Sequence, residues 1–535
     1  MAPATVLQAN LIKYQRMFIL ITIALLILTI LALVVLRFLL PDFRYNWWVA
    51  TGGVLAAWVS VFAWQSQIPI SLQLPAWQPE FLFSQSPTFI ADGVAWAFSL
   101  SIVALCLAII ITSVVRSNFP SPMNWASTIV FASLGVLAAT ADNPLTLVLI
   151  WAAIDLTELV SQIRIVEDPK LSERVVIAFA SRVSGTLLLL WADMTSAANN
   201  VSFDFRSAPE QAGVFLILAA GLRLGVLPLH LPYPSESTLR RGIGTGLRMV
   251  SAASSLVLLT RIPSGSIVSP YTPYLSLFVS FAALYGSWMW LRAPDELNGR
   301  PYWLIGMGSL AVAAALRGNP IGAAAWGCSL LLVGSVLFLS SEPDRWLARV
   351  TLVGVLPVSA LPFSLTASGW DQLGVFWYNL PFLIVAQAML VAGFVRHAQR
   401  VPTRPGYEDQ PIWGRNVYPI GILLLLLTSL LLGLFGWNGA LQLGTWIAGI
   451  AASMLSLVLL WLTPRLRILN PVRAHWVRPA SPTWLDSGYQ VLWSLYRQLG
   501  RLSTLVTNVL EGESGIMWTL LFLALFISLF TQRTP

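Results

Sequence analysis

Sixteen long apolar stretches account for most of this chain, and each is about as long as a membrane is thick. The hydrocarbon core of a bilayer, about 30 Å across, requires roughly 20 consecutive apolar residues in a helix. Hydrophobic residues make up 57% of the 535 residues and charged residues only 10%, where a soluble domain carries about 25% charged residues. The sequence therefore predicts an all-α polytopic membrane protein with about 16 transmembrane helices.

The predicted spans define the organisation of the chain. We place them near residues 17–40, 47–64, 94–115, 125–141, 144–162, 174–194, 212–231, 243–261, 274–291, 303–316, 320–340, 348–368, 375–396, 417–435, 441–462 and 515–530. They form three N-terminal helices (1–120), helices 4–8 (121–262), helices 9–13 (263–400), helices 14 and 15 (401–463), a polar segment (464–514) and a last span (515–535).

Lysine and arginine are distributed unevenly between the two sets of loops. The loops after odd-numbered spans, with the basic residues at the span ends, hold 22 of the 31 Lys and Arg residues; the other face holds six, and three lie inside spans. By the positive-inside rule, the odd-numbered loops are cytoplasmic and both termini lie on the outer side. We expect an inner or other energy-transducing membrane.

Proline interrupts two of the predicted spans. Span 7 contains Pro228, followed by Leu229 and His230, and span 12 contains Pro357 with Pro362 shortly after it. The two breaks lie five spans apart, which would place equivalent helices in opposite orientations. We therefore predict inverted repeats of five helices each, spans 4–8 and spans 9–13. The alternative is that both prolines are packing features, since proline kinks are common in transmembrane helices.

Ionisable side chains inside the spans are few, and they concentrate in the first group of five. These candidates for an ion path or a buried charge cluster are Asp155, Glu158, Arg182, Arg223, His230 and Arg248, whereas the second group holds essentially none between its ends. Charge at membrane depth must be paired, so we expect Asp155 or Glu158 to pair with Arg223 or Arg248. The alternative is a static ion-pair network, because arginine does not release its proton in a protein.

No motif for a cofactor, a metal or catalysis is visible. The chain has no G-x-G-x-x-G after a strand, no Walker lysine motif and no C-x-x-C. Cys106 and Cys328 lie alone in apolar runs and are interpreted as small buried hydrophobic residues. His397 and His475 lie in Arg-rich stretches and are interpreted as solvated or headgroup-facing residues. We expect no cofactor in this chain, no stand-alone enzymatic activity and no nucleic-acid partner.

The polar segment before the last span contains an apolar period. Leucine and valine recur at spacings of three and four between residues 484 and 510, with Arg497 and Arg501 between them. This pattern predicts a cytoplasmic amphipathic helix. It could lie along the membrane surface, on a neighbouring subunit or over its own helix bundle.

Several short segments carry a family resemblance. They are FIADGV at 89–94, NPL at 143–145 leading to Trp151, GLRLGVLPLH at 221–230, MVSA at 249–252, LPFS at 361–364 and WLDSGY at 484–489. Together with the span count and the amphipathic segment, they resemble the antiporter-like membrane subunits of respiratory complex I, Mrp-type cation/proton antiporters and membrane-bound hydrogenases. The layout is most similar to the largest such subunit of complex I. The resemblance implies broken helices 7 and 12 and a lateral helix before the last span.

The positions that carry protons in that family are altered here. The resemblance places the family's helix 5 glutamate, helix 7 lysine, helix 8 histidine, helix 11 lysine and helix 12 lysine or glutamate at or near Ala152, Arg223, Thr245, Gly334 and Gly369, respectively. Asp155 lies about one helical turn from Ala152 and could restore a pair with Arg223. No comparable replacement is visible in the second group. We therefore expect a degenerate member in which proton conduction is weak or absent.

Three functions remain open from the sequence. The first is an antiporter-like subunit in the membrane arm of a complex-I-like NADH:quinone oxidoreductase, with quinone and redox cofactors held by partner subunits. The second is a subunit of an Mrp-type antiporter or another ion-coupled transport complex, and the third is a structural membrane scaffold. Each of them requires other membrane subunits and the lipid bilayer as partners.

Overall fold

The structure is a computed structural model of the chain. It describes residues 3–466 except 42, 44, 76–85, 116–119, 164–168, 199–204, 206–207, 234–240, 264–266, 268, 341–344, 373, 401–410 and 436–445, together with 487, 490, 491, 494 and 498. The chain divides into two compact units, Met1–Val472 and Arg473–Pro535. The fold and the candidate site described below lie within the first unit.

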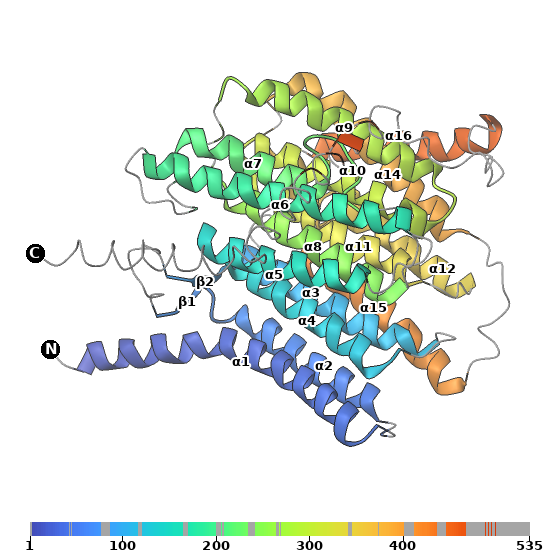
Figure 1. The fold of residues 1–535 in the computed structure, drawn as a ribbon. Coiled ribbons are helices and arrows are strands. Elements are labelled where there is room, and N and C mark those ends of the chain that lie inside the picture. Colours follow the sequence, from blue (N-terminus) through green and yellow to red (C-terminus); the bar gives the residue numbers. More distant parts are fainter. Residues whose placement is uncertain are drawn as a thin grey trace, which may run out of the picture. The chain divides into compact units, whose positions relative to one another are not determined.

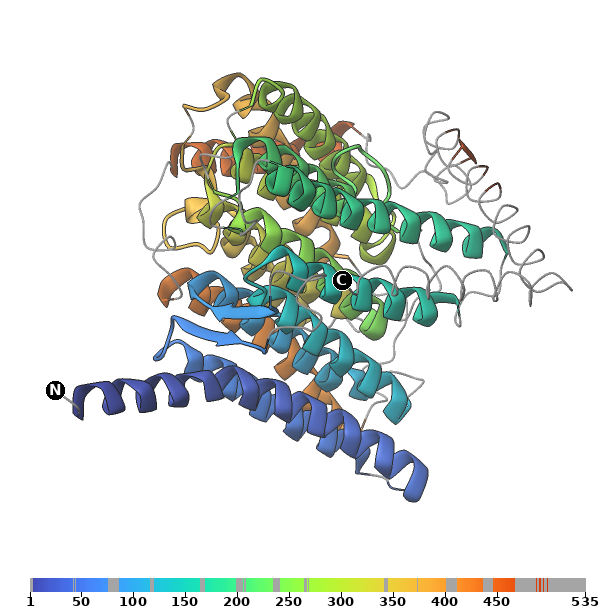
Figure 2. The same ribbon diagram turned by 60° about the vertical axis from the view of Figure 1, so that its left-hand side comes forward.

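Helices make up nearly all of the first unit (Figures 1 and 2). The helices are α1 (Pro3–Leu39), α2 (Asn46–Trp64), α3 (Gly93–Thr112), α4 (Pro122–Thr140), α5 (Pro144–Ile163), α6 (Pro169–Ala198), α7 (Glu210–Leu224), α8 (Arg241–Arg261), α9 (Thr272–Arg292), α10 (Glu296–Leu316), α11 (Pro320–Leu339), α12 (Arg345–Thr351), α13 (Val355–Val358), α14 (Leu380–Ala398), α15 (Ile412–Phe435) and α16 (Trp446–Leu466). Short 3-10 turns are η1 (Ser113–Val115), η3 (Leu352–Gly354), η4 (Ala367–Trp370) and η5 (Trp377–Asn379).

The predicted membrane character is confirmed. Among the described residues, eleven helices are long and apolar enough to cross a membrane, and three shorter apolar helices accompany them. Each of the first fifteen predicted spans coincides with helical segments, whereas the sixteenth, near 515–530, lies outside the described residues. The predicted amphipathic helix at 484–510 also falls largely outside them; the five residues described there are helical and exposed.

Burial separates central helices from peripheral ones. In α3, α8 and α11, 94% of the most apolar 18-residue window is buried, whereas in α1 the corresponding share is 28%. Figure 1 shows α8 and α11 in the middle of the bundle, with α1 and α2 at one edge and α9 and α14 toward the other. A helix that is apolar on all sides and buried on all sides belongs to the interior of the bundle.

The fold contains one small element that the helical pattern did not predict. Strands β1 (Ile70–Gln73) and β2 (Thr88–Ala91) form an antiparallel hairpin in which Ile70 pairs with Ala91 and Gln73 with Thr88. β2 leads directly into α3, where the Asp92 carboxylate accepts a hydrogen bond of 2.8 Å from the Ala95 amide. This cap fixes the first turn of α3.

Two groups of five helices have matching neighbours. In the first half of the bundle, α4–α8, α4 packs on α8 and α5 packs on α6. The second half runs from α9 to α14, and the short helices α12 and α13 together make up its broken span. In this half, α9 packs on α14 and α10 packs on α11. The predicted inverted repeats would produce these matching neighbours; the repeats themselves stay a prediction.

Each half contains a segment in which a helix is interrupted near a proline. α7 ends at Leu224 because Gly225 adopts a left-handed conformation with φ 75°, and the chain continues without helix through the cis Leu227–Pro228 bond. In the second half, Pro357 lies within the single turn of α13, and Pro362 follows in a non-helical stretch. Proline lacks the amide hydrogen that a continuing helix would use.

Candidate functional site

Five charged side chains meet in the interior of the first half. α5 supplies Asp155 and Glu158, which lie three residues apart and therefore on one face of the helix. Arg182, Arg223 and Arg248 approach them from α6, α7 and α8. All five residues are at most 4% exposed, so the charges depend on one another and not on solvent. We call this group the charge network.

The Asp155–Arg223 pair forms the first part of the charge network. Two guanidinium nitrogens of Arg223 lie 2.6 and 2.9 Å from the two carboxylate oxygens of Asp155, in a bidentate arrangement. The guanidinium carbon also lies 4.2 Å above the ring of Trp151, one turn before Asp155. Space for the arginine depends on Gly185 of α6, because a Cβ there would lie 2.7 Å from the Arg223 Cγ. The pair thus fixes α5 against α6 and α7.

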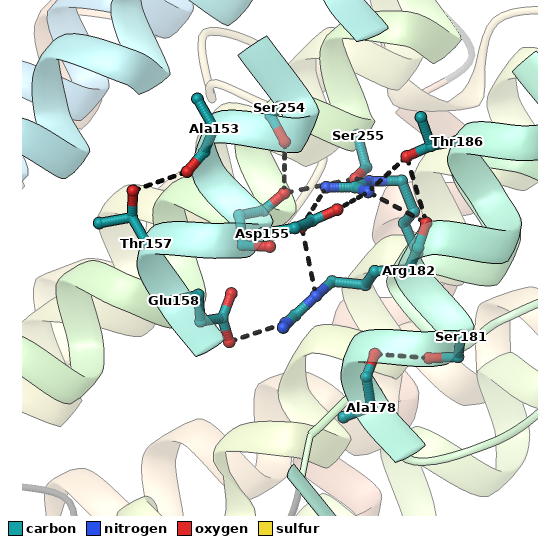
Figure 3. Close-up of polar contacts among 12 residues, drawn as sticks. Ala153, Asp155, Thr157, Glu158, Ala178, Ser181, Arg182, Thr186, Ser254 and Ser255 are labelled. Atoms are coloured by element: carbon teal, nitrogen blue, oxygen red, sulfur yellow. Dashed lines mark hydrogen bonds and ion pairs between the residues drawn. The ribbon is translucent and has the colours of Figure 1, made fainter. Parts of the chain in front are cut away.

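Glu158 forms the second part of the charge network. Its Oε1 accepts from Arg182 at 2.7 Å, from Gln162 at 2.6 Å and from Arg248. The Arg182 Nε lies 3.3 Å from Asp155, so this arginine joins the two parts. Figure 3 shows Arg182 reaching from α6 toward both carboxylates of α5. The sequence left open which arginine pairs with which carboxylate; Asp155 takes Arg223 and Glu158 takes Arg248.

A small cavity adjoins the charge network. Its volume is about 10 Å³, which is close to the space that a single water molecule requires. Glu158, the three arginines, Ser251 and Tyr233 contribute to its walls, and Tyr233 lies under Arg248 with the guanidinium carbon 4.0 Å from the ring centre. The lining is polar enough to hold a water molecule.

His230 and the three prolines lie apart from the charge network. The His230 Nδ1 is 2.8 Å from the Pro228 carbonyl oxygen, so the ring turns back on the break after α7. In the described part of the chain, His230 forms no ion pair with the charge network. Ala152, where the resemblance places the family's helix 5 glutamate, is exposed on the outer face of α5, whereas Asp155 faces inward.

Tryptophan fills the corresponding interior of the second half. A Cβ at Gly334 of α11 would lie 2.3 Å from the Trp303 Nε1, and a Cβ at Gly369 would lie 2.5 Å from the Trp326 Nε1. Both rings are fixed, because Trp303 donates to the Leu330 carbonyl at 3.1 Å and Trp326 to the Gly369 carbonyl at 3.3 Å. The resemblance places the titratable residues of helices 11 and 12 near these two glycines. A side chain at either position would collide with an indole ring.

The burial of three basic residues was not predicted from the sequence. Arg300 of α10 is 1% exposed and donates to the Thr245 hydroxyl at 3.0 Å, which connects the two halves. Arg317, at the end of α10, is also buried. His397 lies in α14 with its ring centre 4.4 Å from that of Trp290, so its interpretation as a solvated residue is wrong. Asp295, which caps α10 by accepting from the Asn298 amide, was the sequence signal that this helix begins before Arg300.

The chemistry open to the charge network follows from its residue types. Arginine keeps its proton in a protein, so the three cations can fix negative charge but cannot relay a proton themselves. Among the described residues, no group of three His, Cys, Asp or Glu side chains could hold a metal ion. The arrangement is suited to binding helices together and to stabilising charge at membrane depth.

Comparison with models of protein families gives no match, and no curated protein sequence matches the chain. Solved structures do match. A chain of the Mrp complex from Dietzia sp. DQ12-45-1b superposes with a TM-score of 0.67 at 15% identity. The match covers 98% of this chain and 63% of the longer Dietzia chain.

Two respiratory complexes contain similar chains. A chain of respiratory complex I from Thermus thermophilus gives a TM-score of 0.57 at 19% identity, covering 77% of this chain and 98% of that one. A chain of the membrane-bound sulfane sulfur reductase, an archaeal respiratory membrane complex, gives 0.59 at 12% identity, covering 94% and 99%. The chain thus has the fold of the antiporter-like membrane subunits found in these multi-subunit membrane complexes.

Proposed function

We propose that this chain is an antiporter-like subunit in the membrane arm of a complex-I-like respiratory complex, and that proton conduction through the chain itself is impaired. Redox chemistry and quinone binding would belong to partner subunits, and the chain would contribute fold, assembly and buried charge. Its likeness to chains of two respiratory membrane complexes supports this assignment.

The observation that carries the impairment is the packing of tryptophan against Gly334 and Gly369. A proton route needs titratable groups or water along its whole length. At these two positions the space for a side chain is taken by the indole rings of Trp303 and Trp326. Both rings are buried and hydrogen-bonded, and they would form an apolar barrier at these two points of the second half.

The first half supports the same proposal. Arg223 lies at the place of the family's helix 7 lysine, and a lysine can have its pKa lowered far enough to release a proton where an arginine cannot. The bidentate pairing of Arg223 with Asp155 fixes both groups. The charge network would then stabilise the fold while carrying no proton current.

The test compares proton translocation by the reconstituted complex with two versions of this chain. The altered version carries Asp155→Leu with Arg223→Met, which removes both charges and keeps apolar volume. We expect the same number of protons translocated per two electrons in both, measured by pH-sensitive dye in proteoliposomes. A fall in that ratio, with the electron-transfer rate unchanged, would show that this chain conducts and would overturn the proposal.

A second function is supported by one observation, the likeness to the Mrp complex chain over 98% of the sequence. Under this alternative the chain would be a subunit of a cation/proton antiporter complex without redox chemistry. Purification in mild detergent separates the two. Copurification with quinone- or NADH-binding subunits supports the respiratory assignment, whereas copurification with small hydrophobic subunits and no redox protein supports the antiporter.

A further inference from the structure

The non-helical segment of broken helix 12 has an unusual backbone. Between α13 and α14, four residues other than glycine adopt left-handed conformations: Ala360 (φ 54°), Phe363 (φ 64°), Gln372 (φ 62°) and Phe376 (φ 58°). Side chains larger than that of glycine raise the free energy of this conformation. Such a backbone persists only where its surroundings hold it in place.

Side chains inside and beside the segment hold its first part. The Thr366 hydroxyl donates to the Pro357 carbonyl at 2.8 Å and accepts from the Ala360 amide at 3.0 Å, which closes a loop. From α14, Gln387 donates to the Val358 carbonyl at 2.9 Å and accepts from the Trp370 indole at 2.9 Å. These contacts fix the two ends of residues 358–370 relative to α14.

Arg317 holds the last residues of this stretch, Gly369 and Trp370, from the other side. It follows α10, is 6% exposed, and donates from Nη2 to the Gly369 carbonyl at 2.9 Å, with its guanidinium carbon 5.3 Å from the ring of Trp370. Asn319, two residues later, donates to the Ser368 carbonyl at 2.8 Å. Burial lowers the pKa of Arg317 to about 10, and nearby Asp371 opposes that shift, so the guanidinium stays charged at neutral pH.

We propose that Arg317 is a latch: its hydrogen bond to the Gly369 carbonyl keeps the segment Ser359–Asp371 closed against the ends of α10 and α11, and so excludes water from that end of the second half. The Arg317 latch is independent of the proposed function, because it concerns access of water to one end of the bundle and not transport through it. Arg317 acts here as a positioning residue.

The physical reason lies in the backbone carbonyls. Buried carbonyl oxygens must be hydrogen-bonded to protein or to water. Without the guanidinium, the Gly369 carbonyl would keep only the longer contact from the Trp326 indole, at 3.3 Å. Water would then compete for this group, and the end of the segment at Gly369 and Trp370 would lose contacts that hold it. The segment should open locally while the rest of the bundle stays folded.

The test measures the accessibility of a cysteine placed inside the segment. Ser364 is 1% exposed and its hydroxyl bonds to none of the described residues, so Ser364→Cys introduces a buried reporter at no cost to the hydrogen bonds seen there. The background carries Cys106→Ala and Cys328→Ala in the full chain, reconstituted in liposomes. A water-soluble maleimide is supplied on the side where α10 ends. We expect slow labelling with Arg317 present, about tenfold faster labelling with Arg317→Met, and partial restoration with Arg317→Lys.

Two controls separate opening of the segment from unfolding of the protein. Arg261→Met removes another arginine, paired with Asp92 at the same end of the bundle, and should leave labelling of the Ser364→Cys reporter unchanged. A second reporter, Ser335→Cys inside α11, should stay unlabelled in every variant. Fast labelling of the Ser364→Cys reporter before Arg317 is altered, equal rates with and without Arg317, or labelling of both reporters in the Arg317→Met variant would each overturn the latch.

Discussion

The two halves of the bundle use their interiors in different ways. In the first half, two carboxylates and three arginines from four helices form the charge network, with each residue at most 4% exposed. In the second half, Trp303 and Trp326 pack against Gly334 and Gly369, near which the resemblance places titratable residues. Both interiors are dense, but among the described residues only the first joins carboxylates and arginines into one network, whereas the buried Arg300 and Arg317 of the second half donate to a hydroxyl and a backbone carbonyl.

The comparison also explains why charge persists in the first half. Replacing one member of a buried ion pair is strongly destabilising, because the partner is left uncompensated. Asp155 contacts both Arg223 and Arg182, and Glu158 contacts both Arg182 and Arg248. Each charge is thus bound to the next, and no single one can be lost without cost. The second half has no such interlocked set among its described residues.

The largest effect is expected from Asp155→Ala. It leaves Arg223 buried without its bidentate partner and should lower the free energy of unfolding by about 3–5 kcal/mol, measured by detergent-induced unfolding. The double variant Asp155→Leu with Arg223→Met removes both charges and should lose much less. Equal losses for the single and double variants would mean that the pair contributes only through its volume, and the contrast between the halves would fail.

The contact between the halves gives the next largest effect. Thr245→Val keeps the shape of the side chain but removes the acceptor for Arg300, and we expect a loss of about 1.5–3 kcal/mol, since the donor is charged. Ser254→Ala on the same helix is the matched control, because among the described residues its hydroxyl bonds within α8, to the Ser251 carbonyl. If both substitutions changed stability equally, Arg300 would not connect the halves energetically.

A smaller effect tests the tryptophan packing of the second half. Gly334→Ala places a Cβ 2.3 Å from the Trp303 ring and should cost about 1–3 kcal/mol. Trp303→Phe, which shortens the ring, should restore part of the loss. Gly52→Ala on α2, where a Cβ would meet nothing within 4 Å, should be neutral or slightly stabilising. Similar melting temperatures for Gly334→Ala and Gly52→Ala would show that the space at Gly334 is open.

The smallest effect is expected where ion pairs reach the surface. Glu296 lies 2.6 Å from Arg241 and 3.6 Å from Arg400, whose side chain is 46% exposed. Glu296→Gln should lower stability by about 0–1 kcal/mol, and this difference should shrink at 1 M salt, where the screening length is about 3 Å. A large, salt-independent loss would place this group with the buried charge network instead.

The bilayer makes the helices of such a chain predictable, because apolar length alone identifies a span. The first fifteen spans were found in this way, and the need to pair charge at membrane depth predicted that Asp155 or Glu158 would meet Arg223 or Arg248. The four-residue strands β1 and β2 are too short for a pattern of alternation to reveal them. Arg300 was missed because the apolar pattern of α10 begins only after Pro301.

The tryptophan packing could not be predicted from the sequence, for a different reason. The sequence shows that Gly334 and Gly369 lack titratable side chains, but it does not show which groups occupy the space beside them. That depends on the direction of two indole rings from other helices, which is set by tertiary packing. The Arg317 contact with Gly369 is likewise formed between segments that are distant in sequence and joined by no periodic pattern.

The positions of ordered water molecules test the contrast between the halves most directly. They can be determined by electron cryomicroscopy of the chain in lipid nanodiscs, at a resolution that shows ordered water. The account predicts a water molecule in the cavity beside Glu158 and Ser251, and none between Trp303 and Gly334 or between Trp326 and Gly369. A continuous file of water through the second half, passing these two glycines, would contradict it.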